Sequence, residues 1–437
     1  MSTQSESTLR YSKSYRCYAL GGLTAVWTIN LVDRGLIAVL LQPIKVDLQL
    51  SDTQLGFLTG LAFALFYAVA GIPIARWSDR HNRVTIASLA LGLWGMTMIA
   101  SVLILNFAQL VVARILAAIG EAGCKPSTYS LVGDYYPEPR ERLRAMSIYL
   151  TGSPLASLLS FVIGGALGEL VGWRMTFAIM GLPGIVLAII FAFTVREPRR
   201  DRELARGAEP VVLPPLSAVF RTLWTDRALR HLCAALIVIY GMGGGFAGWY
   251  GALLARSHGL STAQIGLALG LVLSISGFVG ALLGGSASTR LFGSTETGQM
   301  RFCALASIAM VPCFVGFVLL PTTWAALAAL FPAVMCVFLS QAPAYALMQR
   351  LVPDTMRATM MAVVMLLVSG LGTGLGPQLV GLLSDALAPR SGIESLRYAL
   401  LVFAFGGFWA AFHFARISAV LGCGDAGGQV EHADGLR

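Results

Sequence analysis

Five charged residues stand in stretches of the sequence that are otherwise apolar. Asp33 and Arg34 are adjacent in the first apolar stretch, and Arg114, Glu121 and Lys125 lie in the fourth. A single charge at the centre of a membrane-spanning helix costs about 2.5–3.5 kcal/mol. We therefore expect these side chains to face one another or a water-filled cavity, where carboxylates beside arginines can take up and release protons.

The spacing of the charges allows two interpretations. Arg114 and Glu121 are seven residues apart and so share a helix face, and Glu121 precedes Lys125 by four residues, the favourable order for a helical ion pair. The residues could form a structural network that locks the first and fourth stretches together. Alternatively, Asp33 could carry a proton, with Arg34 and Arg114 as alternative partners, and Glu121 is the second candidate. Desolvation opposes ionisation of a carboxylate and a nearby guanidinium favours it. Opening a cavity could therefore drive the uptake or release of a proton by the carboxylate.

The composition places the chain in a lipid bilayer. Of its 437 residues, 56% are hydrophobic and 12% charged, and its mean hydropathy is +0.74, whereas soluble domains carry about 25% charged residues. About twelve apolar stretches are long enough to cross roughly 30 Å of hydrocarbon. Their centres lie near Thr28, Leu65, Gly95, Leu116, Leu155, Gly184, Gly241, Gly270, Met310, Val334, Ser369 and Gly406.

The chain is a doubled unit. Residues 50–61 and 260–271 are nearly the same sequence 210 positions apart, and each begins with a capping-box pattern, Ser51 with Gln54 and Ser261 with Gln264. Each then has two glycines four residues apart, a pattern that lets helices approach closely in membranes. The second half lacks the charges of the first, because its positions at the same offset are Gly243, Gly244, Trp324 and Phe331. This asymmetry argues against a purely structural network.

Basic residues predict the orientation of the spans. Lysine and arginine gather before the first span and in the even-numbered connections, which places both termini in the cytoplasm by the positive-inside rule. The net charge of +9 reflects this bias and not a nucleic-acid site. We expect a cytoplasmic tail at 1–16, a six-helix bundle at 17–195, a linker with an amphipathic surface helix at 196–230, a second six-helix bundle at 231–421 and a cytoplasmic tail at 422–437.

Enzyme and cofactor signatures are missing from the sequence. The five histidines are isolated, the cysteines lack metal-type spacing, and the GxGxxG match at Gly243 lies inside an apolar span, where helix packing is the better explanation. A phosphate-binding GxxxxGK[ST] loop is also missing. The sequence therefore predicts no catalytic residue, no metal and no cofactor, and energy must come from an ion gradient or from the substrate's own gradient.

Three motifs in the first half resemble one family. They are Asn30-Leu-Val-Asp-Arg34, the loop Asp79-Arg-His-Asn-Arg83, and Arg114-x6-Glu121-Ala122 followed by Gly133-Asp134. Together they are similar to the Spinster family of the major facilitator superfamily. The resemblance implies an all-α membrane protein with twelve transmembrane helices in two pseudo-symmetric six-helix bundles. It also implies a proton-linked carrier of lysophospholipids and sphingoid lipids that works by alternating access.

The resemblance assigns roles to residues of this sequence. The family's functional Asp-Arg pair falls on Asp33 and Arg34, and its Arg and Glu in the fourth helix fall on Arg114 and Glu121. Lys125 departs from the pattern, so it could neutralise Glu121 or present a cation to an anionic head group. We expect Asp79, Arg80 and Arg83 to form a cytoplasmic latch. The candidate residues of a substrate cavity are Asn30, Lys125, Tyr129, Phe246, Trp249, Tyr250 and Tyr345.

These observations predict a monomeric, multi-pass carrier in a bacterial inner membrane, whose partners are an amphiphilic small molecule, protons and the bilayer. The bacterial assignment rests on the large excess of arginine over lysine. A proton-linked carrier of drugs, sugars or organic acids with the same fold is the alternative. A channel, receptor or membrane enzyme is a distant third hypothesis, which the duplication and the central charges oppose.

Overall fold

The structure, a computed structural model, describes residues 11–198, 215–353 and 356–434. Within these ranges it consists of helices and contains no strand. Two compact units are present, one formed by Met1–Ile37 with Leu65–Pro210 and the other by Ala38–Ala64 with Val211–Arg437. We refer to them as unit 1 and unit 2. The segment Ala38–Ala64 contains the connection between the first two spans and the start of the second span, yet it packs with the second half of the chain.

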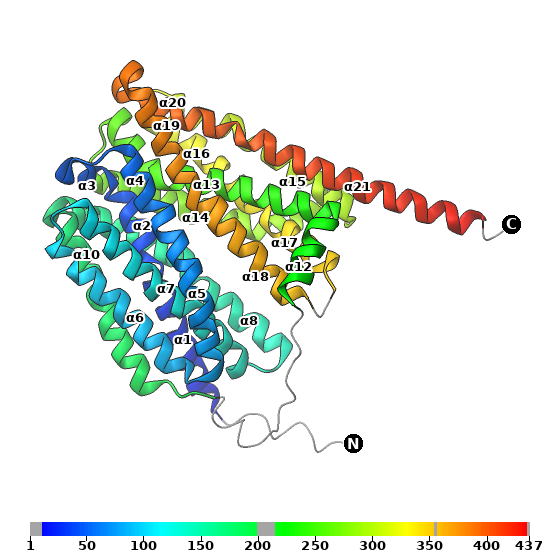
Figure 1. Cartoon of the computed structure of the whole chain (residues 1–437), viewed down its shortest axis with the longest axis horizontal. Coiled ribbons are helices and arrows are strands. Elements are labelled where there is room, and N and C mark those ends of the chain that lie inside the picture. The colour runs from blue at the N-terminus through cyan, green and yellow to red at the C-terminus, as the bar shows by residue number, and fades with distance from the viewer. Residues whose placement is uncertain (1–10, 199–214, 354–355, 435–437) are drawn as a thin grey trace. The chain divides into compact units, whose positions relative to one another are not determined.

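Unit 1 contains the first six apolar stretches. In it, α6 packs against both α7 and α10, and α1 packs against α7 and α9 (Figure 1). The helix α10 includes Gly172 with φ of 78°, so it is two helices joined at a turn. The helices are α1 (Lys13–Asn30), α2 (Val32–Val39), α5 (Leu61–Arg80), α6 (Arg83–Ile99), η1 (Ala100–Leu103), α7 (Phe107–Tyr135), α8 (Pro139–Leu150), α9 (Gly152–Leu158), η2 (Leu159–Ile163) and α10 (Gly164–Thr194).

Unit 2 contains the remaining spans. In it, α15 packs against α16 and α21, and α13 packs against α19, η3 and α21. Its helices are α3 (Leu41–Leu48), α4 (Asp52–Thr59), α12 (Leu216–Thr225), α13 (Arg227–His258), α14 (Thr262–Phe292), α15 (Glu296–Leu319), α16 (Thr323–Leu339), α17 (Gln341–Leu351), α18 (Arg357–Leu367), η3 (Val368–Gly374), α19 (Leu375–Ser391), η4 (Gly392–Glu394), α20 (Ser395–Ala404) and α21 (Gly406–Asp434).

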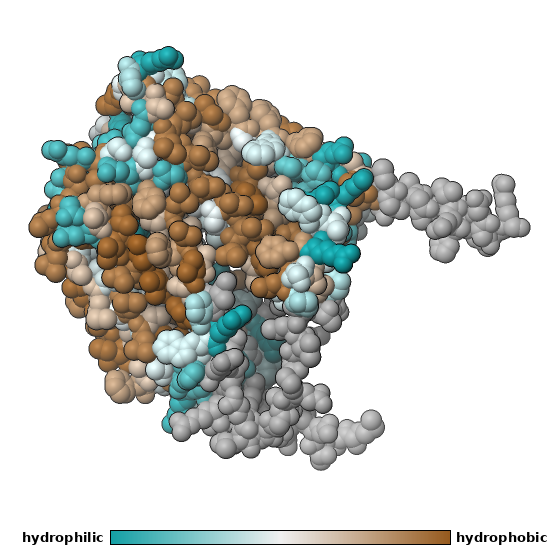
Figure 2. Space-filling view, viewed as in Figure 1, coloured by the Kyte–Doolittle hydropathy of each residue, from teal (hydrophilic) through white to brown (hydrophobic). Residues whose placement is uncertain are grey.

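The described residues contain ten helical segments that are long and apolar enough to cross a membrane. Two of them, Arg144–Thr194 with 51 residues and Thr359–Gly422 with 64, are each long enough to cross twice, because about 20 residues span the hydrocarbon. Large apolar side chains are exposed on these helices, and Phe193 and Leu170 are 86% and 78% exposed. Such side chains cover much of the face in Figure 2, as expected where lipid is the solvent. The chain is a multi-pass membrane protein.

The repeat predicted from the sequence is present in the backbone. Ser51 and Ser261 both form capping boxes, each accepting from the N–H of the glutamine three residues later, which in turn bonds the serine N–H. Two π-helices, η2 and η3, begin at Leu159 and Val368, so their starts are 209 positions apart, about one repeat. π-helical turns inside α-helices commonly mark functional positions.

Glycines allow α13 to lie directly against η3 and α19. A Cβ atom on Gly244 would lie 3.0 Å from Thr373 Cα, and one on Gly376 would lie 2.9 Å from Gly245 N and nearer still to the Gly241 carbonyl oxygen. Within the GxGxxG match itself, a Cβ atom on Gly245 would lie 3.0 Å from Phe403 Cδ1 and one on Gly248 would lie 3.4 Å from Pro377 Cβ, which supports the packing interpretation. The helix α13 is continuous through its glycines, whereas the glycine-rich stretch before Pro377 forms the π-helix η3.

The linker forms the short helix α12 next to the start of α13. Val219 and Leu223 are buried on one side, while Leu216, Phe220 and Trp224 are 57%, 47% and 74% exposed. A helix with exposed aromatic and aliphatic residues is suited to the boundary between water and lipid. Residues 199–214 of the linker lie outside the described residues.

The glycine contact gives a direct test of this packing. We expect Gly376→Ala to destabilise the protein by about 1–3 kcal/mol, the usual cost of inserting a methyl group into a packed site. Gly370→Ala is the matched control, because a Cβ atom at Gly370 meets nothing within 4 Å. Thermal denaturation of the purified protein in detergent measures both. Equal melting temperatures for the two variants would contradict the close contact.

Candidate functional site

The first span is interrupted beside its charged residues. Helix α1 ends at Asn30 and α2 begins at Val32, and the Leu31 N–H bonds the Thr28 carbonyl at 3.2 Å. Asp33 therefore lies in the first turn of a new helix segment. Discontinuous helices form the ion and substrate sites of many secondary transporters, because their ends present unpaired polar groups.

Two ion pairs connect this interruption to α7. Arg114 Nη1 donates to Asp33 Oδ2 at 2.8 Å, and both side chains are buried. Arg34 donates to both oxygens of the buried Glu121, from Nε at 3.2 Å and through a shorter bond from Nη2. The prediction that the central charges face one another is confirmed for four of the five residues, and Lys125 is the exception. Each carboxylate has an arginine partner on the opposite helix, so the two helices are joined by two crossed pairs.

The two pairs differ in their access to solvent. Asp33 and Arg114 are 0% and 6% exposed at their side chains, whereas the Arg34 side chain is 48% exposed. The Arg34 guanidinium also lies 5.6 Å from the centre of the Tyr67 ring. Asn30 is fully buried, and neither its side-chain oxygen nor its nitrogen has a partner among the described residues. Asp33 Oδ1 likewise lacks one.

Lys125 lies next to an aromatic group. Its ammonium nitrogen is 5.6 Å from the centre of the Trp27 ring, and the residue is exposed. Trp27 stacks on Tyr149 with ring centres 5.6 Å apart, and Tyr149 meets the edge of Tyr129 at 6.4 Å. Tyr129 is 51% exposed, while Trp27 and Tyr149 are buried. A cation and an open aromatic wall thus lie on the same part of unit 1.

The other aromatic candidates lie in unit 2, and most are packed into its core. Phe246 stacks on Phe314 at 4.2 Å, and Tyr250 meets Phe317 at 5.5 Å. Phe246, Trp249 and Tyr250 are at most 3% exposed, and the Trp249 indole N–H bonds the Pro377 carbonyl. Their side chains are therefore in contact with neighbouring helices of unit 2, and their role in a substrate cavity stays a prediction. Their packing holds α13 against its neighbours in unit 2.

Tyr345 is different, because it is partly exposed. Its hydroxyl lies 2.7 Å from the hydroxyl of Tyr240 on α13 and also contacts the Met365 sulfur at 3.8 Å. Tyr345 therefore joins α17 to α13 and α18 through a polar contact. Its role in a substrate cavity stays a prediction.

Arg83 is the centre of a buried cluster at the start of α6. It donates to Glu197 from its backbone N–H at 2.7 Å and from its guanidinium, to Asp134 at 2.5 Å and to Ser130 at 2.7 Å. Sequence reasoning missed Glu197, which follows the sixth span. Neighbouring Asn82, where the superfamily motif has glycine, caps α6 by accepting from the Thr85 N–H. The side chains of Asp79 and Arg80 lie outside the described residues.

A second charged cluster in unit 2 has no counterpart in the sequence motifs. Asp52, at the start of α4, is 2% exposed and accepts two bonds of 2.7 Å from Arg256 on α13. It also accepts from Lys45 and from the Ser384 hydroxyl. Arg256 donates in addition to the Gln42 side chain at 2.9 Å. Four helices therefore meet at one carboxylate.

Asp385 extends the Asp52 cluster. Its two oxygens accept from the backbone N–H groups of Asp52 and Thr53 at 3.0 and 2.7 Å, which are the first N–H groups of α4. A carboxylate at a helix N-terminus is favoured because those N–H groups lack partners within the helix. The segment between the first two spans is thereby fixed to α13 and α19.

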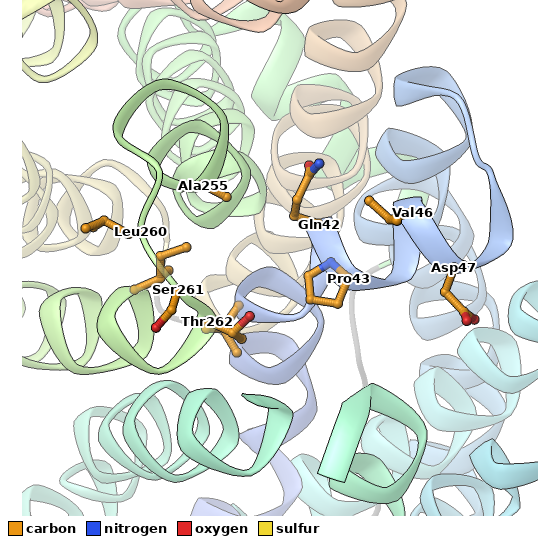
Figure 3. Close-up of a pocket in the computed structure, with 10 residues that line it drawn as sticks. Gln42, Pro43, Val46, Asp47, Ala255, Leu260, Ser261 and Thr262 are labelled. Atoms are coloured by element: carbon orange, nitrogen blue, oxygen red, sulfur yellow. The ribbon is translucent and has the colours of Figure 1, made fainter. Parts of the chain in front are cut away.

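A pocket of ≈ 440 Å³ lies beside this cluster (Figure 3). It is lined by Val39, Gln42, Pro43, Val46, Asp47, Ala255, Leu260, Ser261, Thr262 and Ile265. None of the central charged residues of unit 1 belongs to this lining. The pocket is therefore separate in composition from the site predicted around Asp33.

The histidines are less isolated than the sequence indicates. His231 Nδ1 and His413 Nδ1 lie 2.8 Å apart between α13 and α21. Among the described residues, however, no group of three or more potential ligands could hold a metal ion. Spacing along the chain could not reveal this pair, since 182 positions separate its members.

The chain and its fold match a known class of membrane protein. The model of the Major Facilitator Superfamily matches residues 23–377, which is most of the chain. The chain belongs to the Major Facilitator Superfamily and is a membrane transporter, not an enzyme. This confirms the fold class predicted from the sequence.

Comparison with individual proteins confirms the likeness to Spinster. A solved structure, a bacterial homologue of the human lysosomal transporter Spinster in an inward-facing and unoccupied conformation, has a TM-score of 0.82 and 29% identity over 94% of this chain and 98% of that one. An MFS-type efflux pump of Mycolicibacterium smegmatis is 33% identical over 88% of each chain. The sphingosine-1-phosphate transporter SPNS2 of Danio rerio is 23% identical over 89% of this chain and 81% of its own length.

The Asp52 cluster predicts a large loss of stability on substitution. We expect Asp52→Ala to destabilise the protein by about 3–5 kcal/mol, because Arg256 would remain buried without its carboxylate. Glu296→Gln is the control, since its partner Arg350 is 63% exposed and such pairs contribute about 0–1 kcal/mol. Unfolding of the purified variants by heat in the same detergent gives the comparison. A shift for Asp52→Ala as small as the control's would show that the cluster contributes little.

Proposed function

We propose that this protein is a proton-coupled secondary transporter that moves lysophospholipid or sphingoid-type amphiphiles by alternating access. The observation that carries the proposal is the pair of crossed ion pairs, Asp33 with Arg114 and Glu121 with Arg34, at the interruption of the first span. Such buried ionisable groups are costly in a membrane and mark ion pathways.

In this proposal Asp33 carries the proton. Protonation would remove its negative charge and so weaken the 2.8 Å bond that Arg114 donates to it. Because removing one partner of a buried pair leaves the other uncompensated, Arg114 would need a new partner. A change of conformation can supply that new partner. In such a rearrangement the carboxylate of Glu121, now paired with Arg34, is available as a second acceptor.

The amphiphile assignment rests on two kinds of support. One is the likeness to Spinster proteins over nearly the whole chain. The other is the mixture of chemistry in unit 1, where the exposed Arg34 and Lys125 stand beside Tyr67, Trp27 and Tyr129. Cations can hold a polar head group and aromatic faces can hold apolar substrate surface.

The remaining assignments follow from the distribution of basic residues. We propose an inner-membrane location with both termini in the cytoplasm, which puts the Arg83 cluster at the cytoplasmic side and the Asp52 cluster at the outer side. In that orientation the Arg83 cluster, with Asp79 and Arg80, would serve as the cytoplasmic latch. The monomeric state stays a prediction.

A second candidate is a proton-linked carrier of drugs, sugars or organic acids. The 33% identity to an MFS-type efflux pump favours it. The fold is compatible with both, because one fold supports many substrates. Binding of tail-matched lysolipids compared with binding of sugars and organic acids separates the two candidates.

Asp33→Asn tests the coupling. We expect the variant to lose pH-driven accumulation of substrate in liposomes while retaining substrate binding, because an amide cannot cycle a proton yet has nearly the same shape. Glu394→Gln is the control, as its partner Arg397 is a neighbour on the same helical turn. Accumulation by Asp33→Asn at the rate of the control would remove Asp33 from the coupling pathway.

A further inference from the structure

Lys125 is the surplus cation of the central charges. Arg114 is bonded to Asp33 and Arg34 is bonded to Glu121, so each of the two carboxylates already has an arginine partner. The five residues together carry three positive and two negative charges. Of the two roles expected for Lys125, neutralising Glu121 is therefore filled by Arg34. The Lys125 ammonium lies over the face of Trp27, 5.6 Å from the ring centre.

The aromatic face under Lys125 is held in place from several sides. Trp27 stacks on Tyr149, whose hydroxyl lies 2.8 Å from the Thr128 hydroxyl. On the other side, α9 begins so close to α1 that a Cβ atom on Gly152 would lie 2.8 Å from Trp27 Cδ1. The ring therefore cannot turn freely. Lys125 itself is exposed, so its ammonium is open to a ligand.

We propose that Lys125 on Trp27 forms a head-group site that selects amphiphiles with an anionic head and rejects those that end in a quaternary ammonium. This inference rests on the proposed function and names the substrate class of the same site. Aromatic faces are the usual receptors for quaternary ammonium groups. Here the face already holds a cation of the protein, so a choline group meets both an occupied ring and a like charge.

An anionic head group is attracted to Lys125, whereas a choline group is repelled by it. A phosphate or carboxylate oxygen can accept a charge-assisted hydrogen bond from the Lys125 ammonium, and such bonds are about twice as strong as neutral ones. The exposed Arg34 guanidinium adds a second positive group in the same unit. Binding an anion would also bring the net charge of the five central residues and ligand to zero or below. Lys125 thereby sets the preference for head-group charge.

The test compares three ligands with the same acyl tail. These are a lysophosphatidic acid, a lysophosphatidylcholine and an uncharged monoacylglycerol, titrated against the full-length protein in a neutral detergent. We expect Lys125→Gln to weaken binding of the phosphate ligand about 10- to 100-fold, the range for a hydrogen bond to a charged group. The uncharged ligand should bind equally, and the choline ligand should bind more tightly because the Trp27 ring is no longer occupied by a cation.

Two further variants keep the result interpretable. Lys125→Arg should retain the preference for the anion, because it keeps the positive charge. Lys13→Gln removes a lysine at the exposed start of α1 and should change none of the three affinities. Thermal denaturation of each variant shows whether the fold is intact.

Each outcome decides a separate point. Equal losses for all three ligands in Lys125→Gln would overturn the head-group role and leave the amphiphile assignment standing. Failure of every amphiphile to bind the wild type would overturn the proposed substrate class instead. In that case the affinity for a water-soluble organic acid is measured instead. The anion site is supported if Lys125→Gln weakens this affinity and Lys125→Arg retains it, and any other result overturns it.

Discussion

Charge inside hydrocarbon has to be matched by opposite charge, and the central part of unit 1 is arranged around that requirement. The effective penalty for burying an unpaired ion is several kcal/mol. Asp33 and Glu121 are both buried, and each is bonded to an arginine from the opposite helix. The interruption at Leu31 places Asp33 and Arg34 where both can reach α7. The pairs thus join the first and fourth spans.

The two halves share features of backbone structure and differ in their charged side chains. Capping boxes at Ser51 and Ser261 recur one repeat apart, as do the π-helices η2 and η3. At the same offset, however, the second half has Gly243, Gly244, Trp324 and Phe331 in place of these charges. Gly244 packs α13 against η3, whereas Trp324 lies on α16 and is 84% exposed. The paired central charges are therefore a feature of the first half.

The Asp52 cluster shows how a segment from the first half of the sequence is held against the second half. Ala38–Ala64 belongs to the first half in sequence but packs with unit 2, held by bonds from Arg256, Ser384 and Asp385 to α4 and its first residue. A transport cycle that moves this segment away from α13 must break a two-fold arginine–carboxylate bond. Pairing of both oxygens gives this contact geometric specificity as well as strength.

Much of the protein could be predicted from its sequence, because lipid imposes rules that act locally. Composition and spacing predicted the membrane spans, the internal repeat at residues 50–61 and 260–271, and the central position of Asp33 and Glu121. The tertiary structure alone decided which arginine each carboxylate bonds, that Phe246 and Trp249 are buried, and that Glu197 and Arg256 complete charged clusters. These partners are far apart along the chain, so only the packing of helices brings them together. A side chain's type determines what it can bond, and its distance to other helices determines what it does bond.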